Sequence, residues 1–201
     1  YFVGADVWIT PFFGFHTSYQ SSLNATIKGS PTGSEFSPVD KEWFSAGLRF
    51  RKFFGLDSTS PGLTFGIDFS EYQMKPPGDD DNRIGIKSSG VKLSVESQIP
   101  STYHWTLGFN VIPRADHKEL ETGIDAESGN NQETTSVGIS VGGKFIYSRK
   151  NQVYWKLSHQ VEKNLFEGET NINDPITNSQ IDGVDVTNSL TTFSIGYTWG
   201  N

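Results

Sequence analysis

The chain of 201 residues has no cysteine, no long apolar run and no excess of positive charge. Without cysteine there is no disulfide, no thiolate metal ligand and no cysteine nucleophile. Apolar runs stop at three residues, as in Tyr1-Phe2-Val3, whereas a membrane-spanning helix needs about 20. The formal net charge of −7 argues against nucleic acid as a partner, because binding to phosphates requires a basic surface.

The sequence is nevertheless rich in aromatic residues, which make up 13% of the chain, and it contains 21 glycines. Disordered chains have few aromatic residues, so disorder of the whole chain is excluded. Apolar residues recur at every second position rather than at helical spacing, a pattern that indicates β-strands. Eight segments show it: Tyr1–Ile9, Trp43–Lys52, Leu63–Ser70, Ser89–Ile99, Thr102–Val111, Ser136–Ser148, Val153–Glu162 and Thr191–Trp199.

The segment lengths and the connections between them favour a membrane barrel. A tilted membrane-spanning strand needs about 9–11 residues, and the eight segments are close to that length. Short turns alternate with long polar stretches, of which Thr10–Glu42 is the first, and the long stretches hold most of the acidic residues. Long loops at one end and short turns at the other are typical of outer-membrane barrels. We predict an all-β fold, an eight-stranded antiparallel up-and-down transmembrane β-barrel, as a single domain over residues 1–201 with Tyr1 and Asn201 at the periplasmic end.

Side-chain volume indicates which face of each strand points outward. The interior of an eight-stranded barrel is just wide enough to be filled by side chains. The apolar face carries many bulky aromatic residues, whereas the other face is mostly glycine, serine, threonine and charged residues. We therefore predict that the apolar face contacts lipid. The alternative is a soluble, lipocalin-like barrel with an apolar pocket, for which a polar outer face and a helix after the last strand would be expected.

The chain resembles the small eight-stranded outer-membrane barrels, such as the OmpA-like membrane domain. The opening Tyr1-Phe2-Val3-Gly4-Ala5-Asp6 is similar to a first strand of that group, and Thr191–Trp199 is similar to its closing strand. The resemblance extends over the whole chain but rests on pattern rather than on a sharp motif. It implies a location in the outer membrane of a Gram-negative bacterium.

The inward face of this barrel is predicted to hold charged residues of both signs. Buried charges persist only when they are paired and hydrogen-bonded, so we predict a network that plugs the lumen, with Arg49, Asp68, Glu96 and Lys144 in one group. The alternative is a narrow or gated pore lined by the same residues. The predicted lumen network comprises Asp6, Arg49, Arg51, Asp68, Lys92, Glu96, Lys144, Lys156 and Glu162.

Aromatic residues cluster where membrane barrels have their interfacial girdles. The set predicted at the short-turn interface is Tyr1, Tyr103, Trp105, Tyr147, Trp155, Tyr197 and Trp199. Six other aromatic residues have no obvious place in a strand, and we expect them in loops that contact a surface partner: Phe12, Phe13, Phe15, Tyr19, Phe36 and Phe166.

The function predicted from these features is that of a non-enzymatic outer-membrane protein with a structural or surface-interaction role. We predict no catalytic residues, no metal and no cofactor. Outer-membrane lipid and lipopolysaccharide are the expected partners, and a monomer is the expected state. A lipid-modifying enzyme is the remaining alternative, because the His16-x-Ser18 pair resembles the nucleophile and base of outer-membrane lipid A deacylases. We place this pair in a loop just beyond Pro11-Phe12-Phe13-Gly14, whereas the pair of the deacylases lies on a strand. Matched strand ends also offer no Asp/His group of the outer-membrane protease type.

Overall fold

The computed structural model describes residues 1–22, 25–28, 36–56, 60–75, 85–100, 104–120, 133–148, 151–173 and 177–199, with the side chains of some of them left out. All the regular structure in these ranges is β-strand. No helix in the described part of the chain is long and apolar enough to cross a membrane. The strands are β1 (Phe2–Trp8), β2 (Phe13–Ser21), β3 (Ala25–Lys28), β4 (Phe36–Phe53), β5 (Gly62–Lys75), β6 (Gly85–Ile99), β7 (Trp105–Leu120), β8 (Glu133–Ser148), β9 (Asn151–Asn173) and β10 (Gln180–Trp199).

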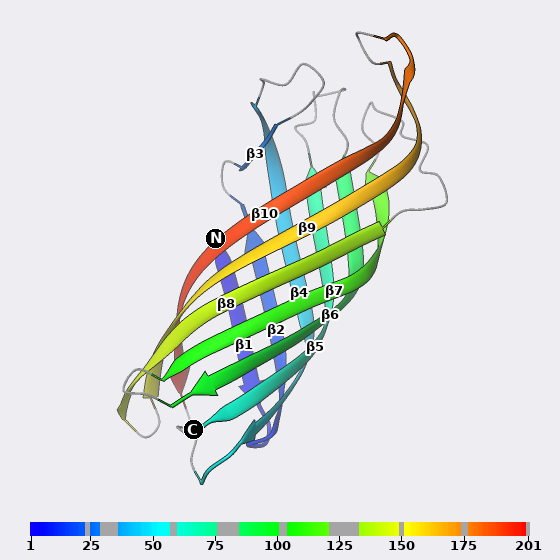
Figure 1. Ribbon diagram of the computed structural model, residues 1–201. Coiled ribbons are helices and arrows are strands. Elements are labelled where there is room, and N and C mark those ends of the chain that lie inside the picture. Colours follow the sequence, from blue (N-terminus) through cyan, green and yellow to red (C-terminus); the bar gives the residue numbers. More distant parts are fainter. Residues whose placement is uncertain are drawn as a thin grey trace.

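The strands form one antiparallel sheet that curls into a nearly closed barrel (Figure 1). Its hydrogen-bonded order is β1-β2-β4-β5-β6-β7-β8-β9-β10, and β3 pairs with the upper part of β4. The two ends of this order approach each other, because Gln20 Nε2 on β2 donates a 2.9 Å hydrogen bond to Thr192 Oγ1 on β10. The predicted all-β antiparallel barrel is therefore confirmed.

The predicted number of eight strands is not confirmed, because the barrel order contains nine. The additional strand is β2, which lies inside the stretch Thr10–Glu42 that we predicted as a loop. A tight turn joins it to β1: Thr10 Oγ1 accepts hydrogen bonds from the backbone N–H groups of Phe12 and Phe13 at 3.2 and 2.9 Å. β2 then pairs with β1 from Gly14 to Gln20 and with β4 along its whole length.

The extra strand also changes the position of the N-terminus. β1 and β10 run in the same direction, with an odd number of strands in the order, so Tyr1 and Trp199 lie at different heights (Figure 1). The Tyr1 ammonium group donates to the backbone oxygen of Ser21 at 2.6 Å, at the end of β2 that faces the long connections. The prediction that Tyr1 lies at the short-turn end was wrong, because it assumed an even strand count. Asn201 lies outside the described residues.

Strand β5 shows how the sequence sorts side chains between the two faces. Phe65, Ile67 and Phe69 point outward and are 52%, 49% and 51% exposed, whereas the intervening Asp68 is 1% exposed. Similar outward apolar residues continue around the barrel, and we call them the apolar band. The band includes Val3, Val7, Phe15, Phe44, Phe50, Phe65, Ile67, Phe69, Val91, Leu93, Trp105, Leu107, Phe109, Val137, Ile139, Phe145, Val153, Leu157, Val161, Phe193, Ile195, Tyr197 and Trp199.

Above the band, the polarity of the two faces is reversed. On β5 the inward residues change from Asp68 and Ser70 to the buried Tyr72 and Met74, while the outward residues change to Glu71 and Gln73. The buried apolar residues form an upper core inside the barrel. It consists of Val39, Tyr72, Met74 and Ile86, packed against Ala25, Trp43 and Val186.

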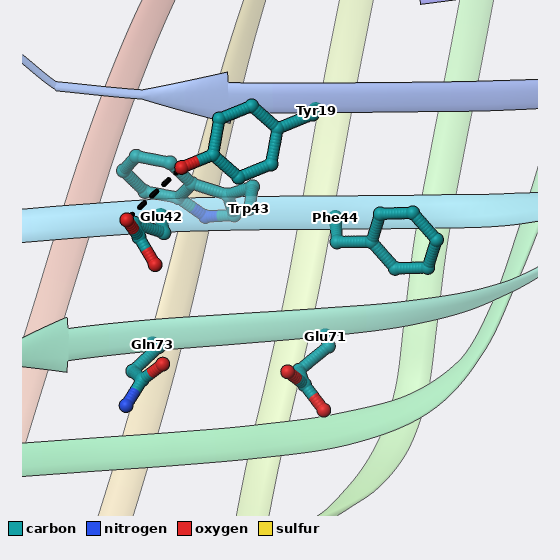
Figure 2. A pocket seen from close by; sticks show the side chains of 6 residues that line it. All are labelled: Tyr19, Glu42, Trp43, Phe44, Glu71 and Gln73. Carbon is teal, nitrogen blue, oxygen red and sulfur yellow. Dashed lines mark hydrogen bonds between the residues drawn. The ribbon is translucent and has the colours of Figure 1, made fainter.

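The outer surface beside the upper core is polar, as Figure 2 shows. Tyr19 Oη donates a 2.9 Å hydrogen bond to Glu42, which precedes the outward Phe44 by two residues on β4. Glu71 on the next strand pairs with Lys87 on β6 at 3.2 Å. The barrel therefore has a lower part with an apolar outside and an upper part built like a soluble β-barrel, with its apolar residues inside.

Candidate functional site in the barrel lumen

The innermost ion pair of the lumen joins β4 to β5. Arg49 donates two hydrogen bonds to Asp68, Nη1 to Oδ1 at 2.5 Å and Nη2 to Oδ2 at 2.9 Å. Both side chains are almost completely buried. Lys92 is the register neighbour of Asp68 on β6 and lies on the same inward face. Charge-assisted pairs of this two-bond geometry are the strong ones in protein interiors.

A second polar group joins β6 to β8 and β9 across the lumen. Lys156 on β9 donates to Glu96 on β6 at 2.7 Å, and Lys144 on β8 donates to Gln98 at 2.9 Å. We predicted that Arg49, Asp68, Glu96 and Lys144 form one group. Among the hydrogen bonds of the described residues, the direct bonds instead fall into two groups, one around Arg49 and one around Glu96.

Two residues of the predicted network lie toward the ends of the barrel. Arg51 Nε donates to the backbone oxygen of Pro11 at 2.8 Å, and its guanidinium lies 3.8 Å from the ring centre of Trp8. Glu162 on β9 is buried and accepts a 3.3 Å hydrogen bond from Asn164. Arg51 thus contacts the turn between β1 and β2, and Glu162 lies toward the upper end of the barrel.

The remaining member, Asp6, belongs to a different arrangement on β1 and β2. Its Oδ1 lies 2.8 Å from Nδ1 of His16, and Nε2 of His16 lies 3.2 Å from Oγ of Ser18. Ser18 Oγ is in turn 2.9 Å from Oγ of Ser45 on β4. Asp6 and His16 are register partners in the antiparallel ladder, and Ser18 follows two residues after His16, so all three side chains point into the lumen.

The partners of His16 determine the direction of these hydrogen bonds. An ionised carboxylate only accepts, so Nδ1 of a neutral His16 carries the proton and donates to Asp6. Nε2 then has a lone pair and accepts from the hydroxyl of Ser18, which leaves the hydroxyl of Ser45 to donate to Ser18 Oγ. The chain Asp6–His16–Ser18 therefore has the order carboxylate, imidazole, hydroxyl that removes a proton from a hydroxyl group.

The structure describes some of the aromatic residues that we predicted at the short-turn interface. Trp105 and Trp155 make an edge-to-face contact with ring centres 5.7 Å apart, and Tyr197 Oη donates to Asn151 at 2.6 Å near the short-turn end. Trp199 ends β10 there. Tyr1 instead packs near Tyr19, 6.0 Å between ring centres, toward the other end. Tyr103 and the side chain of Tyr147 lie outside the described residues.

The aromatic residues predicted for surface loops also need a correction. Phe13, Phe15 and Tyr19 lie on β2, where Phe15 is part of the outward apolar band. Phe12 lies in the short turn before β2 and is exposed. The side chains of Phe36 and Phe166 lie outside the described residues.

Comparisons with known proteins identify no family for the chain. No protein-family model matches the chain, and no curated protein matches it. One similar solved structure is in-vitro folded OmpT, an outer membrane protein of Vibrio cholerae, in its trimer form. The two chains are 12% identical with a TM-score of 0.36, and the match covers 98% of this chain and 54% of the other. The chain thus spans about half the length of that outer membrane protein.

The prediction that the chain is not an enzyme is corrected. It depended on His16 lying in a loop and on the absence of an Asp/His pair from matched strands. Both premises were wrong, because His16 lies on β2 and contacts Asp6 at 2.8 Å.

Sequence reasoning missed β2 and, with it, the contact between Asp6 and His16. A usable signal was present: from Phe13 to Ser21, polar or small residues alternate with Phe13, Phe15, Thr17 and Tyr19. The segment follows Pro11 closely, and a short first hairpin fits such spacing. Recognising that hairpin would have placed Asp6 opposite His16.

Proposed function

We propose that the protein is an outer-membrane barrel whose lumen is closed to free diffusion of solutes. One observation carries this proposal: the barrel has an apolar band on its outside, and side chains obstruct its lumen at two heights. The proposal thus has two parts. The barrel lies in the outer membrane, and it acts through its wall and its two ends rather than as an open channel.

The apolar band supports the membrane location. Large side chains such as Phe65, Ile67 and Phe69 are about half exposed, around a ring of strands. A monomeric soluble protein rarely exposes a continuous apolar surface of this extent, whereas hydrocarbon chains would cover it without cost. Outer-membrane lipid and lipopolysaccharide are therefore the proposed partners of the band, and a monomer is the proposed state.

The interior supports the closed lumen. The lower obstruction is the Arg49–Asp68 pair, which lies at the height of the apolar band, and the upper obstruction is the apolar core around Tyr72 and Met74. A nine-stranded barrel is hardly wider than an eight-stranded one, whose interior is filled by its own side chains. Ions would have to displace both layers to pass.

Conductance in a planar lipid bilayer tests this proposal. The folded wild-type barrel should insert without a steady conductance. A double variant that truncates one residue of each layer, Arg49→Gly with Met74→Gly, should conduct. A control that truncates one outward neighbour of each, Leu48→Ala with Gln73→Ala, should stay closed. A large, stable conductance of the wild type would overturn the proposal and favour the alternative of a narrow pore.

A further inference from the structure

We propose that Ser18 is the nucleophile of a hydrolytic site inside the barrel, with His16 as its base and Asp6 as the residue that orients the base. The chemical class of substrate is a carboxylic ester with an apolar group. This inference goes beyond the closed barrel proposed above and is independent of whether the lumen conducts.

The geometry of the three residues carries the proposal. Distances of 2.8 Å from Asp6 to His16 and 3.2 Å from His16 to Ser18 fall at the hydrogen-bond reach expected for a hydroxyl nucleophile, its base and the orienting carboxylate. Each of the two nitrogen atoms of His16 has its own partner, so the imidazole is held in one orientation. Asp6 and His16 come from paired strands of a rigid sheet, and this fixes their separation better than a loop would.

Access to Ser18 is the second observation. The residue opposite Ser18 on β1 is Gly4, which has no side chain of its own, and Ser18 remains partly exposed beside the ring of Phe2. The side chain of Asp6 is 49% exposed and that of His16 is 17% exposed, in contrast to Asp68, which has no exposure at all at its side chain. The buried ion pair of the lumen is therefore inaccessible, but the Ser18 site can be reached.

The inward face of β1 provides the walls of the site. Phe2, Gly4, Asp6 and Trp8 alternate along that face, and the ring of Phe2 lies over Gly4, next to Ser18. Phe2 is 41% exposed, which is unusual for an inward-facing aromatic residue beside a polar cluster. An aromatic wall on a site of this kind favours a substrate with an apolar group.

The proposed reaction consumes one ester and one water. His16 Nε2 takes the hydroxyl proton as Ser18 Oγ forms a bond to the carbonyl carbon, and the bond to the alkoxy oxygen breaks as that oxygen takes the proton from Nε2. Water then adds to the acyl-Ser18 carbon as His16 Nε2 takes its proton. The bond from that carbon to Ser18 Oγ breaks as Oγ takes the proton back from Nε2, and the carboxylic acid leaves. The Ser45 hydroxyl, 2.9 Å from Ser18 Oγ, is placed to donate to the negative oxygen that forms at the carbonyl.

Covalent labelling of the detergent-folded full chain tests the proposal. A fluorophosphonate probe should label the wild type at Ser18, and p-nitrophenyl butyrate should be hydrolysed. Ser18→Ala should lose both reactions, and Asp6→Asn should lower hydrolysis by about 10²–10⁴-fold, as expected when the orienting carboxylate is removed. The matched control is Ser94→Ala, an inward-facing serine on β6, which should react like the wild type. Labelling that persists in Ser18→Ala, or a folded wild type that is not labelled, would overturn the proposal.

A second measurement separates catalysis from a merely structural role of His16. Because the chain has no cysteine, Ser18→Cys introduces a single thiol whose alkylation by iodoacetamide can be followed directly. With His16 as its base, this thiol should react at least ten-fold faster than the same thiol in Ser18→Cys with His16→Gln, at neutral pH. Equal rates in two variants that both migrate as folded barrels would show that His16 does not activate residue 18.

Discussion

Arg49 and Asp68 are joined by two parallel hydrogen bonds across β4 and β5, although neither residue is the register partner of the other. The register partner of Arg49 is Gly66 and that of Asp68 is Gly47. A Cβ atom at Gly66 would collide with the Arg49 guanidinium, and one at Gly47 would collide with Asp68. The diagonal ion pair therefore occupies the space that two glycines leave open.

Removing Arg49 should destabilise the barrel strongly. The Asp68 carboxylate has no side-chain exposure, so Arg49→Ala removes both hydrogen bonds of its ion pair from a buried charge, at a cost of about 3–5 kcal/mol. Urea unfolding of the barrel in lipid vesicles measures the change. The double variant Arg49→Ala with Asp68→Ala should recover a large part of that loss, and a double variant as unstable as the sum of the two singles would show that the residues do not interact.

Much of this architecture follows from the sequence, because a period of two is a simple pattern. Phe65, Ile67 and Phe69 alternate with Gly66 and Asp68, and both the strand and its outward face follow from that alternation. Long strands such as β9 extend beyond their predicted ends, since the upper core reverses the polarity of the faces there. Polar residues on an outward face, such as Glu71, look like loop residues in the sequence alone.

The site was harder to predict than the fold, for two physical reasons. The first is strand pairing: Asp6 and His16 are in contact only because β1 and β2 form a hairpin. The predicted strand set lacked β2, so it could not place the two residues opposite each other. The second is that opposite charges on one inward face have several possible partners. Lys144 can reach Gln98 or Glu96, and only the three-dimensional arrangement selects Gln98.

Replacing Gly47 by alanine should be more harmful than replacing Gly66. A Cβ atom at Gly47 would strike the backbone oxygen of Ile67, which cannot move away, whereas one at Gly66 would meet the ends of the Ser94 and Arg49 side chains. We expect Gly47→Ala to cost about 1–3 kcal/mol, as other overpacked substitutions do, and Gly66→Ala to cost less. The same urea titration compares them, and an order in which Gly66→Ala is the worse variant would contradict this account.

The upper core should contribute to stability as the core of a soluble barrel does. Ile86 is completely buried among Val39, Tyr72 and Met74, so Ile86→Ala should destabilise the barrel by about 2–5 kcal/mol. Lys87 is its outward neighbour on the same strand and forms a partly exposed surface ion pair with Glu71. Lys87→Ala is therefore the matched control, with an expected change below about 1 kcal/mol. Equal effects of the two substitutions would mean that no packed core exists at this height.

The orientation in the membrane can be tested with single cysteines, because the chain itself has none. Long connections of outer-membrane barrels face the outside and short turns face the periplasm. Thr26 on β3 is exposed near the long connections, and Leu56 is fully exposed in the short connection between β4 and β5. In intact cells, a membrane-impermeant maleimide should label Thr26→Cys and leave Leu56→Cys unlabelled, while both should react after the outer membrane is permeabilised. Labelling of Leu56→Cys alone in intact cells would reverse the orientation, and with it the side of the membrane on which the upper core lies.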